Sequence, residues 1–427
     1  MRYSELTKEQ LLAQREELLA QYNKYVEMGL SLDMSRGKPS SEQLDISLEM
    51  LNVLNSDTNC RTNTGLDCRN YGLLDGLAPC KEMFAKCIQV KPEQIMVGGN
   101  SSLNMMFDTI SCMMTASIAE GCKPWYEVSD RKFLCPVPGY DRHFSITEYF
   151  GFEMIPVPMT EQGPDMDVVE ELVSSDSSIK GIWCVPKYSN PLGITFSDET
   201  VRRFANLKPA AADFRIMWDD AYCVHDLEDE GDKLLSLMDE CEKAGNPDLP
   251  IIFCSTSKIT FPGAGVAAMA SSANNMKVFK GRYTCQTIGY DKMNMLRHIL
   301  FFENFEGIKA HMAKHKDILK PRFDTVIRKF NEHLAPCDIA DWKTPRGGYF
   351  VSIDLYPGTA KKVFSMCADA GLVLTTAGAT FPLGVDPEDS NIRIAPSFPP
   401  VEELEIAMDV FCVCVRICAI DKMLEAM

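Results

Sequence analysis

A lysine that follows three hydroxyl residues is the most reactive feature of this sequence. Lys258 comes after an apolar run of strand length, Ile251–Cys254, and the residues between them are Ser255, Thr256 and Ser257. A lysine acts as a nucleophile or proton carrier when its neighbours lower its pKa and leave a neutral amine. We therefore interpret Lys258 as the reactive group of a site at a strand end. The alternative, a solvated surface lysine, is disfavoured by the hydroxyls beside it.

Four other apolar runs are also followed by polar or aromatic residues that could contact a ligand. The Gly-Gly-Asn-Ser-Ser segment 98–102 precedes a helix, and free N–H groups at a helix start bind phosphate. Tyr140 could cover a planar ligand, and Asn190 stands at a turn. Asp219 and Tyr222 follow a further run, and a carboxylate that ends a buried strand needs a positive partner.

Each of these segments alone has a structural explanation. Segment 98–102 could be a plain helix cap, Asn190 a turn residue and Tyr140 a core aromatic. In a parallel sheet, however, the carboxyl ends of the strands meet at one edge. A ligand that matches the whole set carries a phosphate, a flat ring, a ring oxygen, a ring nitrogen that needs a counter-charge, and an aldehyde. Pyridoxal 5'-phosphate has all of these groups.

The elements that position these residues are predicted by continuous apolar runs separated by helix-length segments. The expected strands cover 94–97, 133–137, 181–185, 215–218 and 251–255, with helices at 79–90 and 103–119 among the segments between. Continuous rather than alternating runs are typical of parallel strands buried on both faces. We expect an α/β fold, with a mainly parallel seven-stranded sheet between helices and a smaller α+β domain.

The pattern changes after residue 300. Segments 309–330, 360–370 and 402–423 read as helices, and 348–353 reads as a strand. At the other end of the chain, residues 5–28 form an amphipathic helix that a Thr7–Gln10 capping box begins. We expect an N-terminal helix and arm over residues 1–45 that packs with the small domain. The large cofactor-binding domain would cover 46–300 and the small domain 301–427.

Eight short segments recur in the order typical of one enzyme family, from about residue 30 to residue 400. They are Ser35-Arg36-Gly37-Lys38-Pro39-Ser40 with Gln43-Leu44-Asp45, Arg69-Asn70-Tyr71-Gly72, Gly98-Gly99-Asn100-Ser101-Ser102, Pro138-Gly139-Tyr140, Ser189-Asn190-Pro191-Leu192-Gly193, Asp219-Asp220-Ala221-Tyr222, Ser255-Thr256-Ser257-Lys258 and Asn391-Ile392-Arg393. The chain resembles the fold-type I, class I aminotransferases, and more narrowly the bacterial type Ic aspartate aminotransferases. The resemblance implies ping-pong transfer of an α-amino group between an amino acid and a 2-oxo acid.

The resemblance also implies a role for each residue. Lys258 would form the internal Schiff base and move a proton between the substrate Cα and the cofactor's C4′. Asp219 would pair with the pyridine nitrogen, Asn190 and Tyr222 with the ring's phenolic oxygen, and Tyr140 would stack on the ring. The implied phosphate ligands are Asn100, Ser101, Ser102, Ser255 and Ser257, joined by Tyr71 from the second subunit of a homodimer with shared active sites.

On the substrate side, the resemblance implies that Arg393 binds the α-carboxylate, with Arg36, Gly37 and Asn190 nearby. Three alternatives stay open: Arg393 as a structural ion pair, Tyr71 as a packing residue, and Ser257 as a mere neighbour of Ser255. An acidic amino acid, aspartate or glutamate, would need a second cation. The candidates are Arg36, Arg142 and Lys187.

One departure from the family pattern concerns the phosphate. Many class I relatives have an arginine about eight residues after the lysine, whereas this sequence reads Pro262-Gly263-Ala264-Gly265-Val266. Either hydroxyls and backbone hold the phosphate alone, or another residue compensates, such as Lys38, Arg282 or a partner's side chain.

Composition limits the other classes of function. A net charge of −17 and a pI of about 4.9 argue against a nucleic-acid partner. The 17 cysteines form no Cys-x-x-Cys pair, and we expect free thiols and no metal site. His311 and His315 have the i,i+4 spacing of metal ligands, but no third ligand is evident and we expect surface histidines. Neither a signal peptide nor a membrane span is evident, so we expect a cytoplasmic protein.

Other reactions on the same fold remain as alternatives. A β-lyase or a decarboxylase would need the same motifs. A non-enzymatic sensor of pyridoxal phosphate is disfavoured because the first 30 residues hold no DNA-binding module. A nicotinamide enzyme is disfavoured because no Gly-x-Gly-x-x-Gly follows a strand.

Overall fold

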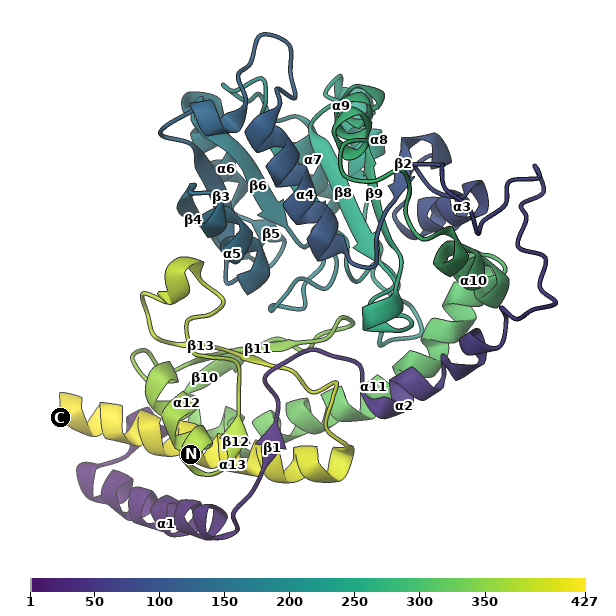
Figure 1. The fold of residues 1–427 in the computed structure, drawn as a ribbon. Coiled ribbons are helices and arrows are strands. Elements are labelled where there is room, and N and C mark those ends of the chain that lie inside the picture. Colours follow the sequence, from purple (N-terminus) through teal and green to yellow (C-terminus); the bar gives the residue numbers. More distant parts are fainter. Residues whose placement is uncertain (1) are drawn as a thin grey trace.

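The computed structural model describes residues 2–427 and divides into a part built on a large sheet and a part that contains two long helices (Figure 1). The large sheet has the strand order β2 (Ile95–Val97), β9 (Ala267–Ser271), β8 (Pro250–Ser255), β7 (Arg215–Asp219), β6 (Ile179–Cys184), β3 (Lys132–Val137), β4 (Glu153–Thr160) and β5 (Gly163–Pro164). Pairing is parallel from β8 through β4, while β9 and β5 are antiparallel to their neighbours. The expected mainly parallel sheet of seven strands is present, and the two-residue β5 adds an eighth at the edge.

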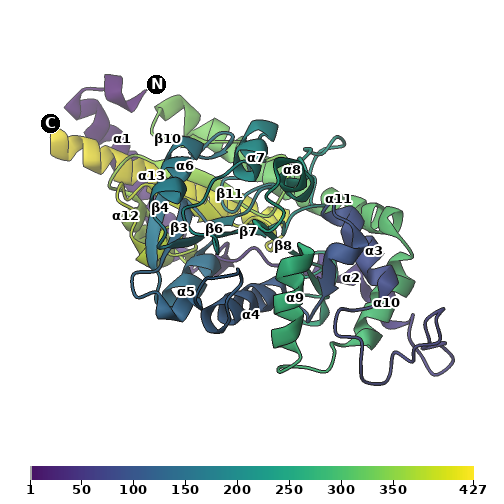
Figure 2. The ribbon, with the colours of Figure 1, turned by 90° about the horizontal axis from the view of Figure 1, so that it is seen from above.

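Helices cover both faces of this sheet (Figure 2). One face carries α6 (Met166–Ser175), α7 (Asp198–Ala205) and α8 (Leu237–Ala244), and the other carries α4 (Ser102–Thr115), α5 (Asp141–Tyr149) and α9 (Ala273–Tyr283). Every residue of β6 and β7 is buried as a result. Burial on both faces explains why these strands read as continuous apolar runs in the sequence. Two further helices, α3 (Ala78–Cys87) and α10 (Lys292–Phe302), contact each other beside β2.

The second part combines a small antiparallel sheet with long helices. Its sheet has the order β10 (Ala340–Trp342), β11 (Val351–Leu355), β13 (Asn391–Ile394), and its helices are α11 (Phe305–His333), α12 (Ala360–Asp369) and α13 (Val401–Ala426). The N-terminal helix α1 (Lys8–Glu27) packs against α13, and β1 (Leu32–Asp33) pairs with β12 (Leu372–Val373). The short α2 (Ser41–Asp45) then lies on α11. The expected domain boundaries near residues 45 and 300 remain a prediction.

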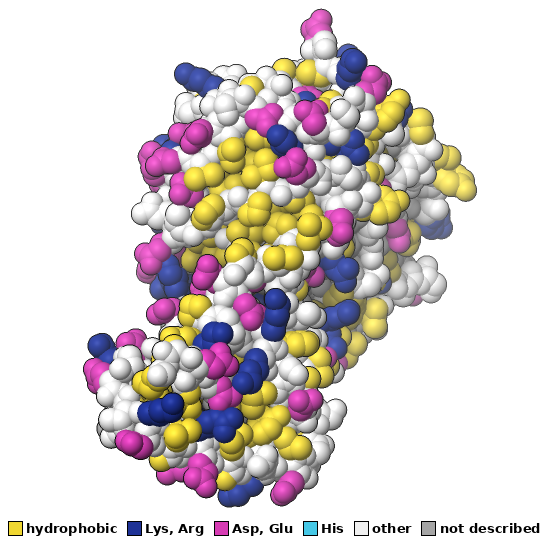
Figure 3. Space-filling model, turned by 90° about the vertical axis from the view of Figure 1, so that its left-hand side faces the viewer, with side chains coloured by type: hydrophobic (Ala, Val, Ile, Leu, Met, Phe, Trp, Pro, Cys, Tyr) yellow, Lys and Arg dark blue, Asp and Glu magenta, His cyan; other side chains and the backbone are white. Residues whose placement is uncertain are grey.

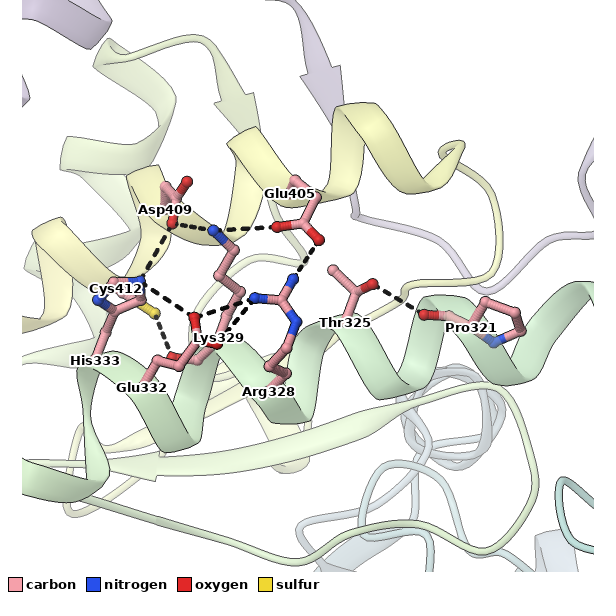
Figure 4. A network of polar contacts seen from close by, with 9 residues as sticks. All are labelled: Pro321, Thr325, Arg328, Lys329, Glu332, His333, Glu405, Asp409 and Cys412. Atoms are coloured by element: carbon pink, nitrogen blue, oxygen red, sulfur yellow. Dashed lines mark hydrogen bonds and ion pairs between the residues drawn. The ribbon is translucent and has the colours of Figure 1, made fainter.

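Apolar packing and a network of ion pairs join α11 to α13 (Figure 4). Lys329 Nζ lies 2.6 Å from Asp409 Oδ1 and 3.1 Å from Glu405 Oε2. Phe330 and Phe411 pack beside this network with ring centroids 6.0 Å apart. Lys329 is largely buried, and the cost of removing its charge from water offsets the attraction of its ion pairs, so we attribute most of the stability of this contact to its buried apolar side chains.

The outer edge of the large sheet is protected by proline. Figure 3 views the molecule from the side on which β4 lies, and apolar side chains gather over the upper part of this face. Pro156 and Pro158 of β4 are exposed, and both are aligned with β3 in parallel register. Since proline has no N–H, the free edge of β4 lacks donors at these positions and is a poor template for a further strand.

Several local predictions are confirmed. Thr7 and Gln10 form the expected capping box at the start of α1. All 17 cysteines are free, and most of them, including Cys184, Cys254 and Cys414, are buried like small hydrophobic residues. In residues 2–427, no helix combines the length and the apolar character that crossing a bilayer requires.

Candidate active site

The five polar segments meet in one cavity at the carboxyl edge of the large sheet, as expected from the strand ends. The cavity has a volume of about 150 Å³ and is lined by Ser101, Ser102, Leu103, Met106, Tyr140, Val185, Asn190, Asp219, Ala221, Tyr222, Ser255, Ser257 and Lys258. A second, wider cavity of about 430 Å³ shares Tyr140, Asn190, Tyr222 and Lys258 with it. The small pocket and the larger chamber therefore adjoin, and these four shared residues lie between them.

Lys258 is placed at this wall by the turn that follows β8. Its Nζ atom lies 5.0 Å from the centre of the Tyr222 ring and 5.9 Å from that of Tyr349. Burial lowers the pKa of Lys258, opposed by the negative charge of Asp219 and assisted by the positive charge of Arg393. A larger fraction of neutral amine is consequently available than for a solvated lysine, as nucleophilic or proton-transfer chemistry requires.

Asp219 ends β7 and reaches the same pocket, where His143 holds it. His143 Nε2 lies 3.0 Å from Asp219 Oδ2, and the imidazole stacks on Trp183 with ring centroids 4.4 Å apart at 11°. Within residues 2–427, the other carboxylate oxygen, Asp219 Oδ1, is buried without a hydrogen-bond partner. A buried carboxylate oxygen is costly unless a donor meets it, so this atom points to a cationic or N–H-bearing ligand in the pocket.

The sequence analysis missed His143. It stands three residues after Tyr140 on α5, and burial on the sheet places its ring against Asp219. No local motif marks it, because the contact depends on how α5 packs on the strands. The available signal was a histidine close to a stacking tyrosine, which is too weak to interpret alone.

The opposite end of the pocket contains hydroxyls and a helix start. Ser101 caps α4, with its hydroxyl 3.2 Å from the Leu103 N–H, and Ser255 Oγ donates to Ser257 Oγ at 3.1 Å. The first N–H groups of a helix have no acceptor within the helix and favour an anion. Asn100 differs from the others, because its side chain donates to the Gly263 carbonyl at 3.3 Å and does not line the cavity.

Among the described residues, Lys258 is the only cationic side chain that lines this pocket, and no arginine lines it. Arg282 contacts the Thr115 carbonyl at the far end of α4, and Lys38 stacks over Phe398 at 3.8 Å and lines the wider chamber. Neither suggested substitute for the missing phosphate arginine reaches the pocket in one chain. Hydroxyls and the helix start remain as the groups that could hold a phosphate.

The wider chamber contains most of the expected substrate residues. It is lined by Ser35, Arg36, Gly37, Lys38, Tyr140, Asp141, Arg142, Asn190, Tyr222, Lys258, Phe350, Leu374, Thr375, Thr376, Ala379 and Arg393. Gly37 is placed against Phe350, since a Cβ at this position would lie 2.4 Å from the phenyl ring. A larger residue here would require the Phe350 ring to move.

Arg393 enters the chamber from β13. Its Nη1 donates to Asp141 Oδ1 at 2.8 Å and to Asn190 Oδ1 at 3.1 Å, and its guanidinium lies over the Phe350 ring at 4.7 Å. Its Nε is buried and, within the described residues, lacks a hydrogen-bond partner. The structural ion pair that the sequence left open for Arg393 exists, with Asp141 as the partner, yet a donor remains for a carboxylate ligand.

Two predictions about cations and histidines are wrong. Lys187 lies outside both cavities, because its Nζ donates to Asp226 Oδ1 at 2.9 Å and to the Cys223 carbonyl at 3.0 Å. His311 and His315 are buried rather than on the surface, and both approach the Ile259 carbonyl, at 2.9 and 3.0 Å. The packing of α2 on α11 helps to bury this face of α11. The charged composition of α11 is typical of a solvent-exposed helix, which explains the wrong prediction.

Tyr71 does not reach the pocket of its own chain. Its side chain is 80% exposed, on the loop between α2 and α3. This loop packs on the start of α10, where Lys292 Nζ donates to the Gly72 carbonyl at 2.8 Å. Such an exposed aromatic has the position that a residue donated to a second subunit would need.

Comparison with known proteins decides the family. The family described as aspartate amino-transferase matches residues 6–426, nearly the whole chain. The chain belongs to this aspartate aminotransferase family. Within the family it is similar to the aspartate aminotransferase of Corynebacterium glutamicum, with 46% identity over 404 residues that cover 95% of this chain and 93% of that protein.

Solved structures agree with the family. An aspartate transaminase from Corynebacterium glutamicum has a TM-score of 0.96 at 44% identity, and the match covers 99% of both chains. An α-aminoadipate aminotransferase from Thermus thermophilus, solved with N-(5'-phosphopyridoxyl)-L-leucine, has a TM-score of 0.72 at 18% identity over 96% of this chain and 95% of that one. The second likeness shows the fold alone. The chain is a transaminase of fold type I, and aminotransferases of this fold depend on pyridoxal phosphate.

Proposed function

We propose that this transaminase holds pyridoxal 5'-phosphate on Lys258 and moves the α-amino group of aspartate or glutamate to a 2-oxo acid. The observation that carries the proposal is that Lys258 and Asp219 line the same small buried pocket. Within the described residues, the amine has a lowered pKa and the carboxylate has one oxygen without a partner. A cofactor with an aldehyde and a protonated ring nitrogen satisfies both groups.

The rest of the pocket fits the same cofactor. Tyr140 lies on one wall, and Asn190 has its oxygen taken by Arg393, which leaves the amide N–H₂ as a donor toward a ring oxygen. Ser255, Ser257 and the start of α4 would hold the phosphate. Asn100 would contribute through its backbone rather than its side chain, since the latter is bonded to Gly263.

When bound, the cofactor supplies an aldehyde that accepts amino groups and a ring that accepts the electron pair left at the substrate Cα. Lys258, as a neutral amine, would take the proton from Cα and return it at C4′. Asp219 would offer its Oδ1 to the ring nitrogen, because His143 Nε2 already occupies Oδ2. Lys258 Nζ lies over the Tyr222 ring, and the Tyr222 hydroxyl would hydrogen-bond the ring oxygen.

Arg393 is the proposed clamp for the substrate α-carboxylate. Its free Nε and the bond from Nη1 to Asp141 mean that an incoming carboxylate would compete with Asp141 for the same guanidinium. Asp141 thereby keeps the buried cation paired before substrate arrives. Planar guanidinium and carboxylate groups match in a two-bond geometry.

The distal carboxylate of an acidic substrate needs a further cation, and Arg36 and Arg142 line the chamber. We expect that Arg36→Ala or Arg142→Ala lowers kcat/KM for aspartate by about 10–100-fold, since a hydrogen bond to a charged group contributes about 1.5–3 kcal/mol. Steady-state kinetics with aspartate and with alanine check this. Alanine has no distal carboxylate, so its rate should change by less than about 2-fold.

Arg282→Ala is the matched control for these variants, because Arg282 contacts Thr115 outside the site. It should leave both rates unchanged. Equal losses for aspartate and alanine in both arginine variants would contradict an acidic substrate, as would an unchanged aspartate rate in both.

We further propose a homodimer in which Tyr71 completes the pocket of its partner, and its 80% exposure supports this. Mixing inactive Lys258→Ala chains with weakened Tyr71→Ala chains should restore activity. Half of randomly assorted dimers are mixed, and one of their two sites is intact, so about one quarter of the wild-type rate is expected. Co-refolding the two variants at equal concentration measures this. Activity equal to the average of the separate variants would show that Tyr71 acts within its own chain.

Product analysis tests the reaction itself. Purified enzyme given aspartate and 2-oxoglutarate should form oxaloacetate and glutamate in equal amounts without ammonia. Ammonia release would indicate the lyase alternative, and carbon dioxide release the decarboxylase. The 17 free cysteines support a reducing compartment, and we propose a cytoplasmic location.

A further inference from the structure

The N-terminal arm is connected to the backbone of the reactive lysine by a chain of buried hydrogen bonds. Gln43 of α2 is fully buried, and its Nε2 donates to Tyr349 Oη at 2.8 Å and to His315 Nδ1, 2.9 Å away. Tyr349 then donates to the Lys258 carbonyl at 3.4 Å, and His315 Nε2 donates to the Ile259 carbonyl at 3.0 Å. These carbonyls belong to consecutive residues, so the hydrogen bonds hold the turn that contains Lys258.

The direction of each bond is fixed by its neighbour. Gln43 Oε1 accepts from the Ser40 N–H at 3.1 Å in a capping box, which assigns the amide nitrogen to the other side. An amide N–H₂ only donates, so His315 Nδ1 must be the acceptor and its Nε2 must carry the proton. His311 Nε2 shares the Ile259 carbonyl at 2.9 Å and lies 3.2 Å from His315 Nε2.

Every member of this chain is neutral, and the environment keeps it so. Burial lowers the pKa of His315 to about 4, with the neighbouring His311 acting in the same direction. A second proton on His315 would face the Gln43 donor and break that bond. Burial likewise raises the pKa of Tyr349, so its hydroxyl stays protonated.

The arm is pinned at both ends of this segment. Ser397 Oγ donates to the Lys38 carbonyl at 3.0 Å, and Arg322 bonds Glu42 at 2.6 Å. Arg36 and Gly37, a few residues before Gln43, line the substrate chamber. One short stretch of chain therefore contacts the chamber at one end and the support of Lys258 at the other.

We propose that Gln43, His315 and Tyr349 are positioning residues that transmit the seating of the arm over substrate to the backbone of Lys258. The inference rests on the proposed function, in which Lys258 transfers the proton. Arg36 and Gly37 contact the chamber in which substrate would bind, and Gln43 follows them in the same pinned segment. Through Tyr349 and His315, Gln43 holds the two carbonyls that fix where the lysine side chain begins. Precise placement of a proton-transfer group affects the chemical step more than substrate binding.

The test uses Gln43→Met, which keeps size but removes both donors, and Tyr349→Phe, which removes only the hydroxyl. Each should lower kcat for aspartate by about 10-fold while KM changes by less than about 2-fold. The pH at which the visible band of the lysine-bound cofactor changes should also shift. The double variant should lose no more than the worse single variant, because both break one chain.

Thr325→Val is the matched control, since Thr325 lies on α11 and donates to the carbonyl of Pro321 one turn earlier (Figure 4). It should leave kcat and the visible band unchanged. If Gln43→Met and Tyr349→Phe lower only the melting temperature and leave kcat and the band unchanged, the residues are structural and the proposal is overturned.

Hydrogen–deuterium exchange of the cofactor-free protein gives a readout that is independent of catalysis. Peptides that cover residues 256–262 should exchange faster in Gln43→Met than in wild type, while peptides from β7 should not. Unchanged exchange at 256–262 would overturn the coupling, even in a protein that transaminates normally. An inactive wild-type enzyme with the expected exchange pattern would instead contradict the proposed function alone.

Discussion

Replacing Lys258 by alanine is expected to lower kcat for transamination by about 10⁴-fold or more, the upper range for a positioned acid–base group. The variant loses both the amine that holds the cofactor and the group that carries the proton to and from Cα. The remaining pocket, with Asp219, Tyr140 and the serines, stays in place. Single-turnover kinetics on cofactor-loaded protein, followed by absorbance, measures the loss.

The matched control is Lys277→Ala, because Lys277 is an exposed lysine on α9. It should have wild-type kinetics and the same visible absorbance. Thermal unfolding of cofactor-free Lys258→Ala should occur at or slightly above the temperature for cofactor-free wild type, because the variant removes an amine whose burial is unfavourable. A variant that keeps more than about one hundredth of the wild-type rate would contradict the role of Lys258.

Asp219→Asn is expected to produce the second largest effect, a decrease in kcat of about 10²–10³-fold. The asparagine keeps the shape and the contact with His143 but removes the charge that a protonated ring nitrogen needs. Water cannot replace that charge in a buried pocket, so the variant loses the whole electrostatic stabilisation of the protonated ring. Steady-state kinetics at saturating aspartate and cofactor check the expected decrease.

Asp220→Asn provides an unusually close control. Asp220 is the adjacent residue and equally buried, and burial raises its pKa to about 7. With a pKa of about 7, Asp220 is about half ionised at pH 7 and mostly uncharged at pH 6, so at pH 6 the amide should change kcat by less than about 3-fold. Similar losses in the two variants would mean that burial of the acid pair, rather than the charge of Asp219, supports catalysis.

The large sheet and most of the pocket could be predicted from sequence because their signals are local. Continuous apolar runs mark strands buried on both faces, and the residue after each run lies at the carboxyl edge. Lys258, Asp219, Asn190 and Tyr222 were found in this way. The absence of an arginine near Val266 was also visible, and the pocket contains no replacement within one chain.

The errors arise where position depends on packing between distant segments. His143 supports Asp219 because α5 lies on the sheet. His311 and His315 are buried because α2, the turn at Ile259 and α10 all pack on this face of α11. Lys187 precedes Tyr188, whose backbone adopts a positive φ of 49°, and its side chain turns to Asp226 instead of the chamber. A single sequence contains no local pattern for such contacts.

The bond between Lys258 and the cofactor is the central claim, and it can be tested by chemical trapping. Borohydride reduction of the cofactor-loaded enzyme fixes the cofactor to the lysine that holds it, and peptide mass mapping then identifies that residue. We predict one pyridoxyl phosphate adduct per chain, on the peptide that contains Lys258. An adduct on another lysine, or none in protein loaded with cofactor, would contradict the account.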